Sequence, residues 1–266
     1  MFKKIFFAIV LITFIACNGS NTGNTDNKPT ENPPPPAIAY TIIKAYPHNT
    51  KSFTEGLFWH DNALYESTGN NGESKLMKIN LETGNADKEV KIPDEYFGEG
   101  ISMMNGKIYQ LTWKEHKVFV YDSKTFEKTS ELAWPFEGWG MTHNDSLLII
   151  STGSSNIYFV DPKDFSQKRI LAVTNNYGPV SNINELEYVD GYIYANLYQT
   201  NYILKINTET GKVEAQMDLT GILDRTGKSY NADGIDVLNG IAYNPASKTF
   251  YVTGKYWPAL FEIQLQ

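Results

Sequence analysis

The chain has 266 residues, of which 14% are aromatic, and its formal net charge is −7 at pH 7. This length gives room for one large domain or two small ones. An acidic protein repels phosphate backbones, so the charge excludes nucleic acid as an expected partner. Cys17 is the single cysteine. The chain therefore has no disulfide framework, no cysteine-based zinc site and no cysteine nucleophile with a redox partner.

The first 16 residues predict an export signal. Lys3 and Lys4 precede an apolar-dominated run, residues 5–16, that ends at Cys17. This run is too short to span a bilayer and is typical of a signal peptide. The end of the run resembles a bacterial lipobox, with Phe14 at the position where leucine is usual. We therefore expect an acylated Cys17 at the mature N-terminus, and a lipoprotein of the bacterial cell envelope, either periplasmic or surface-facing. An ordinary signal peptide with an incidental cysteine is the alternative.

Residues 17–38 predict a tether between this anchor and a folded domain. They are rich in Asn, Gly, Thr and Pro and include four consecutive prolines at 33–36. A segment of this composition cannot bury enough apolar surface to fold. We expect one domain over residues 39–266, a monomer that touches the membrane only through the lipid.

From residue 39 onward, short alternating strands are separated by turn residues, without a helical run. A strand start of the type Gly-x-Gly-apolar, or a looser copy of it, recurs at residues 54–57, 98–101, 138–141, 184–187 and 238–241. The reference positions 56, 100, 140, 186 and 240 are 44, 40, 46 and 54 residues apart. These spacings are typical of the four-stranded blades of a β-propeller.

A second repeated element, a turn after a strand, occurs at residues 79–84, 121–126, 160–165 and 206–211. An Asn or Asp opens each turn and can accept a hydrogen bond from the backbone two residues on. The fifth repeat contains no such turn, so it lacks an outermost strand, which the apolar segment 40–46 can supply. We therefore predict an all-β fold, a five-bladed β-propeller closed circularly by an N-terminal strand that leaves no open sheet edge in the ring.

The loops that lead into the innermost strands of a propeller meet at one mouth of the central channel. We expect this mouth to be mostly apolar with a few polar groups, as small-ligand sites are. The expected lining comprises Phe53, Glu55, Phe97, Glu99, Trp139, Asn184, Glu185 and Asn239, with Trp113, Tyr198 and residues 255–257 behind them. Of Glu185 and Glu187, which lie on one strand, we expect at most one to face the channel. The histidines His48, His60, His116 and His143 show no metal-ligand spacing and receive no role.

Eight short segments along the chain resemble the plant- and bacterial-type glutaminyl-peptide cyclotransferases, or glutaminyl cyclases. They occur in order and in every repeat, at residues 53–57, 97–101, 109–114, 138–140, 183–188, 195–198, 238–242 and 253–258. The resemblance implies an enzyme that converts the N-terminal glutamine of peptides or proteins into pyroglutamate and releases ammonia. The substrate's own α-amine attacks its side-chain carboxamide in this reaction, so no protein nucleophile and no cofactor are required.

The resemblance also implies roles for particular residues. Glu99 matches the carboxylate that carries a proton between the two nitrogens, while Lys255 and Asn184 match the groups that stabilise the oxyanion. The family usually has Gln where this chain has Glu55, and Trp where it has Tyr198. A second acid at position 55 is expected to bind the substrate ammonium or to raise the pKa of Glu99. The expected substrate-binding residues are Phe53, Glu55, Phe97, Trp113, Trp139 and Tyr198.

Two other functions are compatible with the pattern. A calcium-dependent propeller hydrolase, such as a lactonase, would use the oxygen ligands that a hard cation prefers, and Glu55, Glu99, Asn184 and Asn239 could supply them. A structural calcium in the channel would fit a cyclase as well. A non-catalytic peptide-binding propeller is the third possibility.

Overall fold

The computed structural model describes residues 32–226 and 234–266. The predicted signal peptide, Cys17 and the tether up to residue 31 lie outside the described residues. Residues 33–266 form one compact unit. Within the described part of this unit, no helix is long and apolar enough to cross a membrane.

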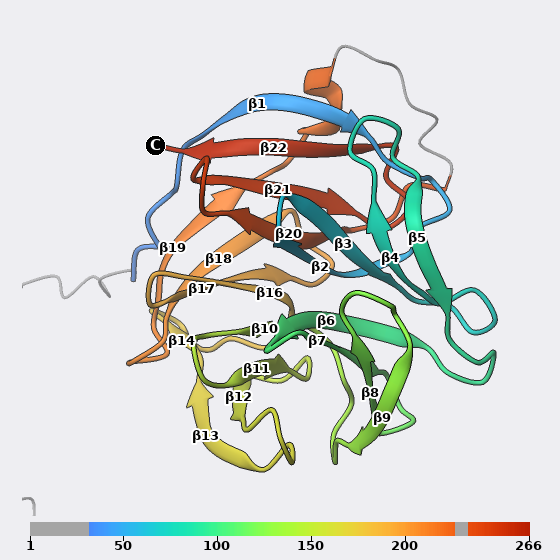
Figure 1. The fold of residues 1–266 in the computed structure, drawn as a ribbon. Helices are drawn as coiled ribbons and strands as arrows, with labels where there is room; N and C mark the ends of the chain where they lie inside the picture. The colour runs from blue at the N-terminus through green and yellow to red at the C-terminus, as the bar shows by residue number, and fades with distance from the viewer. Residues whose placement is uncertain (1–31, 227–233) are drawn as a thin grey trace, which may run out of the picture. The chain divides into compact units, whose positions relative to one another are not determined.

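Five four-stranded antiparallel sheets surround a common centre in the described residues, which confirms the predicted five-bladed propeller (Figure 1). Blade 1 contains β2 (Thr54–His60), β3 (Ala63–Thr68), β4 (Lys75–Ile79) and β5 (Ala86–Lys91). Blade 2 contains β6 (Gly98–Met104), β7 (Lys107–Thr112), β8 (Lys117–Asp122) and β9 (Lys128–Ala133). Blade 3 contains β10 (Met141–His143), β11 (Leu148–Ser151), β12 (Asn156–Val160) and β13 (Gln167–Ala172). Blade 4 contains β16 (Ile183–Val189), β17 (Tyr192–Leu197), β18 (Tyr202–Asn207) and β19 (Val213–Asp218).

Blade 5 closes the ring with strands from both ends of the domain. It contains β20 (Leu238–Asn244), β21 (Thr249–Gly254), β22 (Ala259–Leu265) and, as its outermost strand, β1 (Tyr40–Pro47). β1 pairs antiparallel with β22, from Tyr40 opposite Leu265 to Pro47 opposite Ala259. The predicted circular closure is therefore confirmed. The remaining elements are the small hairpin β14 (Thr174–Asn175) and β15 (Gly178–Pro179), and the short 3-10 helix η1 (Leu223–Thr226).

Residues just before β1 also contact the domain. The Ile38 N–H donates to the Gln216 carbonyl of β19 over 2.8 Å, and the Gln216 N–H donates to the Pro36 carbonyl over 2.8 Å. Backbone pairing along the edge of blade 4 needs no apolar burial, so a proline-rich segment can make it. Residues 36–38, which the composition assigned to the tether, are attached to the domain in this way.

The predicted turns connect the third and fourth strands of blades 1 to 4. In blade 1 the Asn80 Oδ1 accepts hydrogen bonds from the backbone N–H groups of Glu82 and Thr83. Asp122, Asp161 and Asn207 accept the same kind of bond in blades 2, 3 and 4. These side chains fix the tight connections to the outermost strands.

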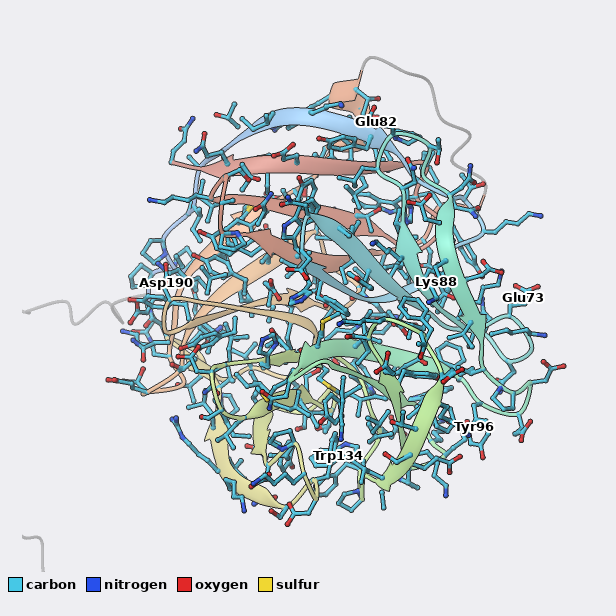
Figure 2. The ribbon with its side chains drawn as sticks, viewed as in Figure 1. Glu73, Glu82, Lys88, Tyr96, Trp134 and Asp190 are labelled. Carbon is cyan, nitrogen blue, oxygen red and sulfur yellow. The ribbon has the colours of Figure 1, made fainter. Side chains whose placement is uncertain are left out.

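Neighbouring blades pack through apolar clusters, one between each pair of blades in the described residues. The inner strands are buried throughout most of their length, whereas β9 at the periphery of blade 2 is almost wholly exposed. Trp134 shows the arrangement: it lies between blades 2 and 3 and is 1% exposed, while Glu73, Glu82 and Asp190 project at the periphery (Figure 2).

The repeated glycines lie where the inner strands approach one another. A Cβ on Gly56 would come within 2.7 Å of the Ile101 nitrogen in blade 2. One on Gly100 would come within 2.5 Å of the Trp139 carbonyl oxygen in blade 3, and one on Gly140 within 2.2 Å of the Asn184 carbonyl oxygen in blade 4. Each glycine thus lets an inner strand contact the backbone of the next blade, which explains the repeat in physical terms.

Two carboxyl groups, one buried on Glu185 and one half-buried on Glu187, connect the inner strands around the channel. Glu185 of β16 accepts backbone N–H groups from Leu57 of β2 over 3.2 Å and from Ile241 of β20 over 2.7 Å. Glu187 accepts the Tyr243 N–H of β20 over 2.9 Å. The expectation that at most one of these acids faces inward is wrong, because residues two apart in a strand point to the same face.

Glu187 should make the stability of the propeller depend on pH. Burial raises its pKa to about 8, against the hydrogen bonds from Tyr243 and Thr142 that lower it. The unfolded carboxyl ionises near 4.5, so between these values the folded state binds more protons. The free energy of unfolding then falls as pH rises, by up to about 1.4 kcal/mol per pH unit.

We expect Glu187→Gln to flatten this dependence, so that its melting temperature at pH 8 exceeds that of the wild type by several degrees and matches it at pH 5. Calorimetric melting at a series of pH values measures the difference. The exposed Glu209→Gln serves as the control and should follow the wild type. Parallel curves for the wild type and Glu187→Gln would show that Glu187 is ionised in the folded protein.

Candidate active site

One cavity of about 320 Å³ opens at the mouth of the channel. Nine residues line it, and they are the nine residues that the sequence analysis predicted to be catalytic or substrate-binding: Phe53, Glu55, Phe97, Glu99, Trp113, Trp139, Asn184, Tyr198 and Lys255. The structure therefore brings together the whole predicted set, although its members are spread over about 200 residues of sequence.

The lining residues occupy two equivalent places in the blades. One group lies at the start of an inner strand, and the other directly follows the second strand of a blade. The first group comprises Phe53, Glu55, Phe97, Glu99, Trp139 and Asn184; the second comprises Trp113 after β7, Tyr198 after β17 and Lys255 after β21. Trp257, which was expected near the mouth, is instead 4% exposed and packs in the core between blades 4 and 5.

Three of the polar lining residues, Glu55, Glu99 and Asn184, and the adjacent Asn239 lie at β-bulges. The register between β2 and β3 shifts between Thr54 and Gly56, where Glu55 lies. Equivalent shifts contain Glu99 in β6, Asn184 in β16 and Asn239 in β20. A bulge releases a residue from regular pairing and turns its side chain. The same irregularity in four blades thus directs polar side chains toward the mouth.

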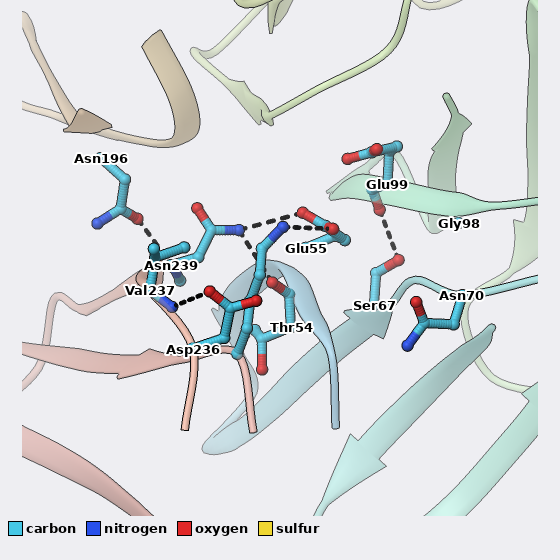
Figure 3. A network of polar contacts seen from close by, with 12 residues as sticks. Thr54, Glu55, Ser67, Asn70, Gly98, Glu99, Asn196, Asp236, Val237 and Asn239 are labelled. Atoms are coloured by element: carbon cyan, nitrogen blue, oxygen red, sulfur yellow. Dashed lines mark hydrogen bonds and ion pairs between the residues drawn. The ribbon is translucent and has the colours of Figure 1, made fainter. Parts of the chain in front are cut away.

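A buried ion pair joins blades 1 and 5 at the cavity floor. The Lys255 Nζ lies 2.6 Å from the Glu55 Oε1, and the two side chains are 5% and 3% exposed. The Asn239 Nδ2 donates to the Glu55 Oε2 over 3.3 Å and to the Thr54 carbonyl over 2.9 Å (Figure 3). Glu55 is therefore fixed by donors on both oxygens.

The two buried acids of the site influence each other. Burial raises the pKa of Glu55 to about 7, against the Lys255 ammonium, which lowers it. Burial and the charge of Glu55 together raise the pKa of Glu99 well above its ordinary value, although Lys255 again acts in the opposite direction. Glu99 is thus the carboxyl that holds its proton to higher pH, and Glu55 is the one that ionises beside the lysine.

Neighbouring blades hold the backbone of the proposed catalytic residues. The Ser67 Oγ of blade 1 donates to the Glu99 carbonyl over 2.5 Å, and Gln110 in turn donates to Ser67. The Ser151 Oγ of blade 3 donates to the Asn184 carbonyl over 2.7 Å. Each inner-strand residue is therefore positioned by the second strand of the preceding blade.

Aromatic rings form the cavity wall in blade order. The ring centroids of Phe53 and Phe97 are 6.0 Å apart, those of Phe97 and Trp113 are 5.6 Å apart, and those of Trp139 and Tyr198 are 5.5 Å apart. The Lys255 Nζ lies 4.2 Å from the Phe53 centroid and 5.4 Å from that of Tyr198. A mostly apolar wall with one buried ammonium limits the water around a bound substrate.

Two groups beside the site were not predicted from the sequence. Glu137 contacts two of the wall tryptophans, and its only signal in the sequence is its position two residues before Trp139. His48, which received no role, forms a buried pair with Glu66 at 3.2 Å and contacts the Trp257 carbonyl at 2.7 Å. Burial lowers the pKa of His48, but Glu66 outweighs this, so the pKa is raised overall.

Several oxygen atoms that could bind the expected calcium already accept hydrogen bonds. Glu55 is occupied by Lys255 and Asn239, and Glu185 by backbone N–H groups. In this region only the Asn184 Oδ1 and the Asn239 Oδ1 are buried without a hydrogen-bond partner among the described residues. Calcium takes six to eight oxygens, so a calcium here would also need Glu99 and further donors, and a structural calcium in the channel stays a prediction. The described residues also contain no group of three or more His, Cys, Asp or Glu side chains arranged to hold a metal.

Comparison with known proteins gives consistent matches. The family model described as glutamine cyclotransferase matches residues 10–265. A glutaminyl-peptide cyclotransferase of Arabidopsis thaliana is 33% identical over 227 residues, which cover 85% of this chain and 71% of that protein. The crystal structure of Myxococcus xanthus glutaminyl cyclase matches with a TM-score of 0.79 and 33% identity, over 87% of this chain and 98% of the other.

Proposed function

We propose, from the premise that this chain belongs to the glutamine cyclotransferase family, that it converts the N-terminal glutamine of peptides or proteins into pyroglutamate and releases ammonia. One observation in particular supports the proposal. A carboxyl group with a raised pKa, Glu99, shares an aromatic cavity with one buried ammonium group, Lys255. The volume of about 320 Å³ is at the lower end for ligand sites and suits a single terminal residue.

The proposed reaction needs only a proton carrier and a charge to stabilise the intermediate. The substrate amine nitrogen bonds to the side-chain carboxamide carbon and closes a five-membered ring. A free α-amine has a pKa near 8, so a Glu99 with a raised pKa exchanges protons with it readily. Glu99 takes one proton from the attacking nitrogen and gives one to the leaving nitrogen. The C–N bond of the carboxamide then breaks and ammonia leaves.

Lys255 and Asn184 are proposed to stabilise the oxyanion that forms when the amine attacks. In an apolar cavity the ammonium of Lys255 acts more strongly than it would in water. Glu55 keeps this ammonium in place through the 2.6 Å contact. The family usually has Gln at position 55. We infer that in this chain Glu55 has the additional effect of keeping Glu99 protonated to a higher pH.

The activity is tested by the release of ammonia from a Gln-initiated dipeptide. Glu99→Gln keeps the shape of the side chain but cannot carry a proton, so we expect kcat to fall about 10²- to 10⁴-fold. Lys255→Ala should lower kcat by a comparable factor. Glu55→Gln should stay active, with its pH dependence shifted to lower pH because the charge next to Glu99 is gone. Glu187→Gln, which changes a half-buried acid on the inner strand β16 outside the cavity lining, serves as the control.

Other outcomes distinguish the alternatives. Tight peptide binding without ammonia release, unaffected by Glu99→Gln, would favour a non-catalytic binding propeller. Activity lost on chelation and restored by calcium would favour a metal-dependent hydrolase. Wild-type rates in both the Glu99 and the Lys255 variants would place the active site elsewhere.

We also propose that Cys17 carries a lipid that anchors the protein to a bacterial membrane after export. The support is the sequence alone: an apolar run ending at a cysteine, followed by residues without another apolar anchor. Cys17→Ser should therefore release the protein from the membrane fraction, because lipid chains supply the attachment. Fractionation of cells that express each form measures this, and a variant that stays with the membranes would contradict the proposal.

A further inference from the structure

The side chains around the cavity mouth form a nearly closed ring. Ring contacts connect Phe53 to Phe97, Phe97 to Trp113, and Trp139 to Tyr198, and Lys255 lies between Tyr198 and Phe53. One connection differs from the others. Trp113 and Trp139 meet through the carboxylate of a third residue, Glu137, which does not itself line the cavity.

A single oxygen of Glu137 accepts both indole N–H groups. The Glu137 Oε2 lies 3.0 Å from the Trp113 Nε1 and 3.3 Å from the Trp139 Nε1. Hydrogen bonds to a carboxylate are stronger than those between neutral groups, and two of them on one atom fix the relative orientation of the two rings. The orientation of this part of the wall therefore depends on Glu137.

The backbone around Glu137 is itself firmly held. The Gly138 N–H donates to the Trp113 carbonyl over 3.0 Å, and the Trp134 Nε1 donates to the Glu137 carbonyl over 3.3 Å. A Cβ on Gly138 would lie 2.6 Å from the Thr112 carbonyl oxygen, so the loop lies directly against blade 2. The carboxylate therefore has a rigid base from which to orient the tryptophans.

Both indoles also contact other residues, Trp139 the backbone at Gly153 and Trp113 the side chain of Lys114. Trp139 covers Gly153, where a Cβ would lie 2.5 Å from the ring. The Lys114 Nζ lies 3.8 Å from the centroid of Trp113. Rotation of either ring would break these contacts as well as the hydrogen bond to Glu137.

We propose that Glu137 is a positioning residue of the site: it holds Trp113 and Trp139 in the orientation that presses the bound glutamine into the bent conformation needed for ring closure. The inference rests on the proposed function. Ring closure within one substrate depends strongly on conformation, and a displacement of about 1 Å can cost about 10²-fold in rate. A flexible wall would leave the glutamine extended.

The activity test uses the full chain with Glu137→Ala and Glu137→Gln. The alanine variant should lose about 10- to 100-fold in kcat/KM. The glutamine variant keeps an oxygen acceptor and should stay within several-fold of the wild type. In the background of Trp113→Phe with Trp139→Phe, which lacks both indole donors, Glu137→Ala should have no further effect. The exposed Glu127→Ala is the control.

A second readout does not depend on activity. The indole N–H signals of Trp113 and Trp139 in nuclear magnetic resonance spectra, assigned with the single Phe variants, should both move in Glu137→Ala. Those of Trp59 and Trp257, which do not contact Glu137, should move little. If these signals move and the wild type releases no ammonia, the cyclase proposal fails but the positioning contact stands. Unmoved signals, or a glutamine variant as impaired as the alanine variant, would overturn the role of Glu137.

Discussion

The close approach of the inner strands around the central channel is the constraint on which the rest of the structure depends. At Gly56, Gly100 and Gly140 there is no space for a side chain, because the backbone of the next blade occupies it. The inner strands do not pair regularly near this approach. β2, β6, β16 and β20 each have a β-bulge close to their first residue. The bulged residues supply the two carboxyl groups and the amide of the cavity, while Lys255 follows β21. The geometry that closes the ring is thus also the geometry that builds the site.

The close packing of the inner strands also limits water in the cavity, and this affects the ionisation of the residues that line it. Glu55, Glu99 and Lys255 come from three different blades and meet in a cavity where each charge is felt strongly by the others. One ammonium can balance the charge of only one of the two acids. Lys255 forms its ion pair with Glu55, and the pKa of Glu99 is raised. A carboxyl whose pKa is raised toward that of an amine can both take and give a proton during a reaction, which is what the proposed cyclisation requires.

Much of this architecture could be predicted from the sequence because it repeats. The spacing of the glycine-containing strand starts predicted five blades, and Asn80 and its counterparts predicted the outer turns through a local interaction. The nine lining residues followed from the blade positions and from the family resemblance. Contacts between blades could not be predicted in this way. The pairing of His48 with Glu66, the bonds of Glu185 to Leu57 and Ile241, and the bridge made by Glu137 depend on which side chains meet across a blade boundary, and no spacing along the chain records that.

The proposed mechanism depends on Glu99 holding its proton to a higher pH than Glu55, which pairs with Lys255. Infrared difference spectroscopy tests it most directly, by comparing the wild type with Glu99→Gln at pH 7 in the absence of substrate. We expect the substitution to remove the carbonyl absorption of a protonated carboxylic acid. In Glu55→Gln, this absorption should weaken at a lower pH than in the wild type. If Glu99→Gln removes carboxylate absorption instead, Glu99 is ionised in the resting protein, and the proposed arrangement of charges in the site is wrong.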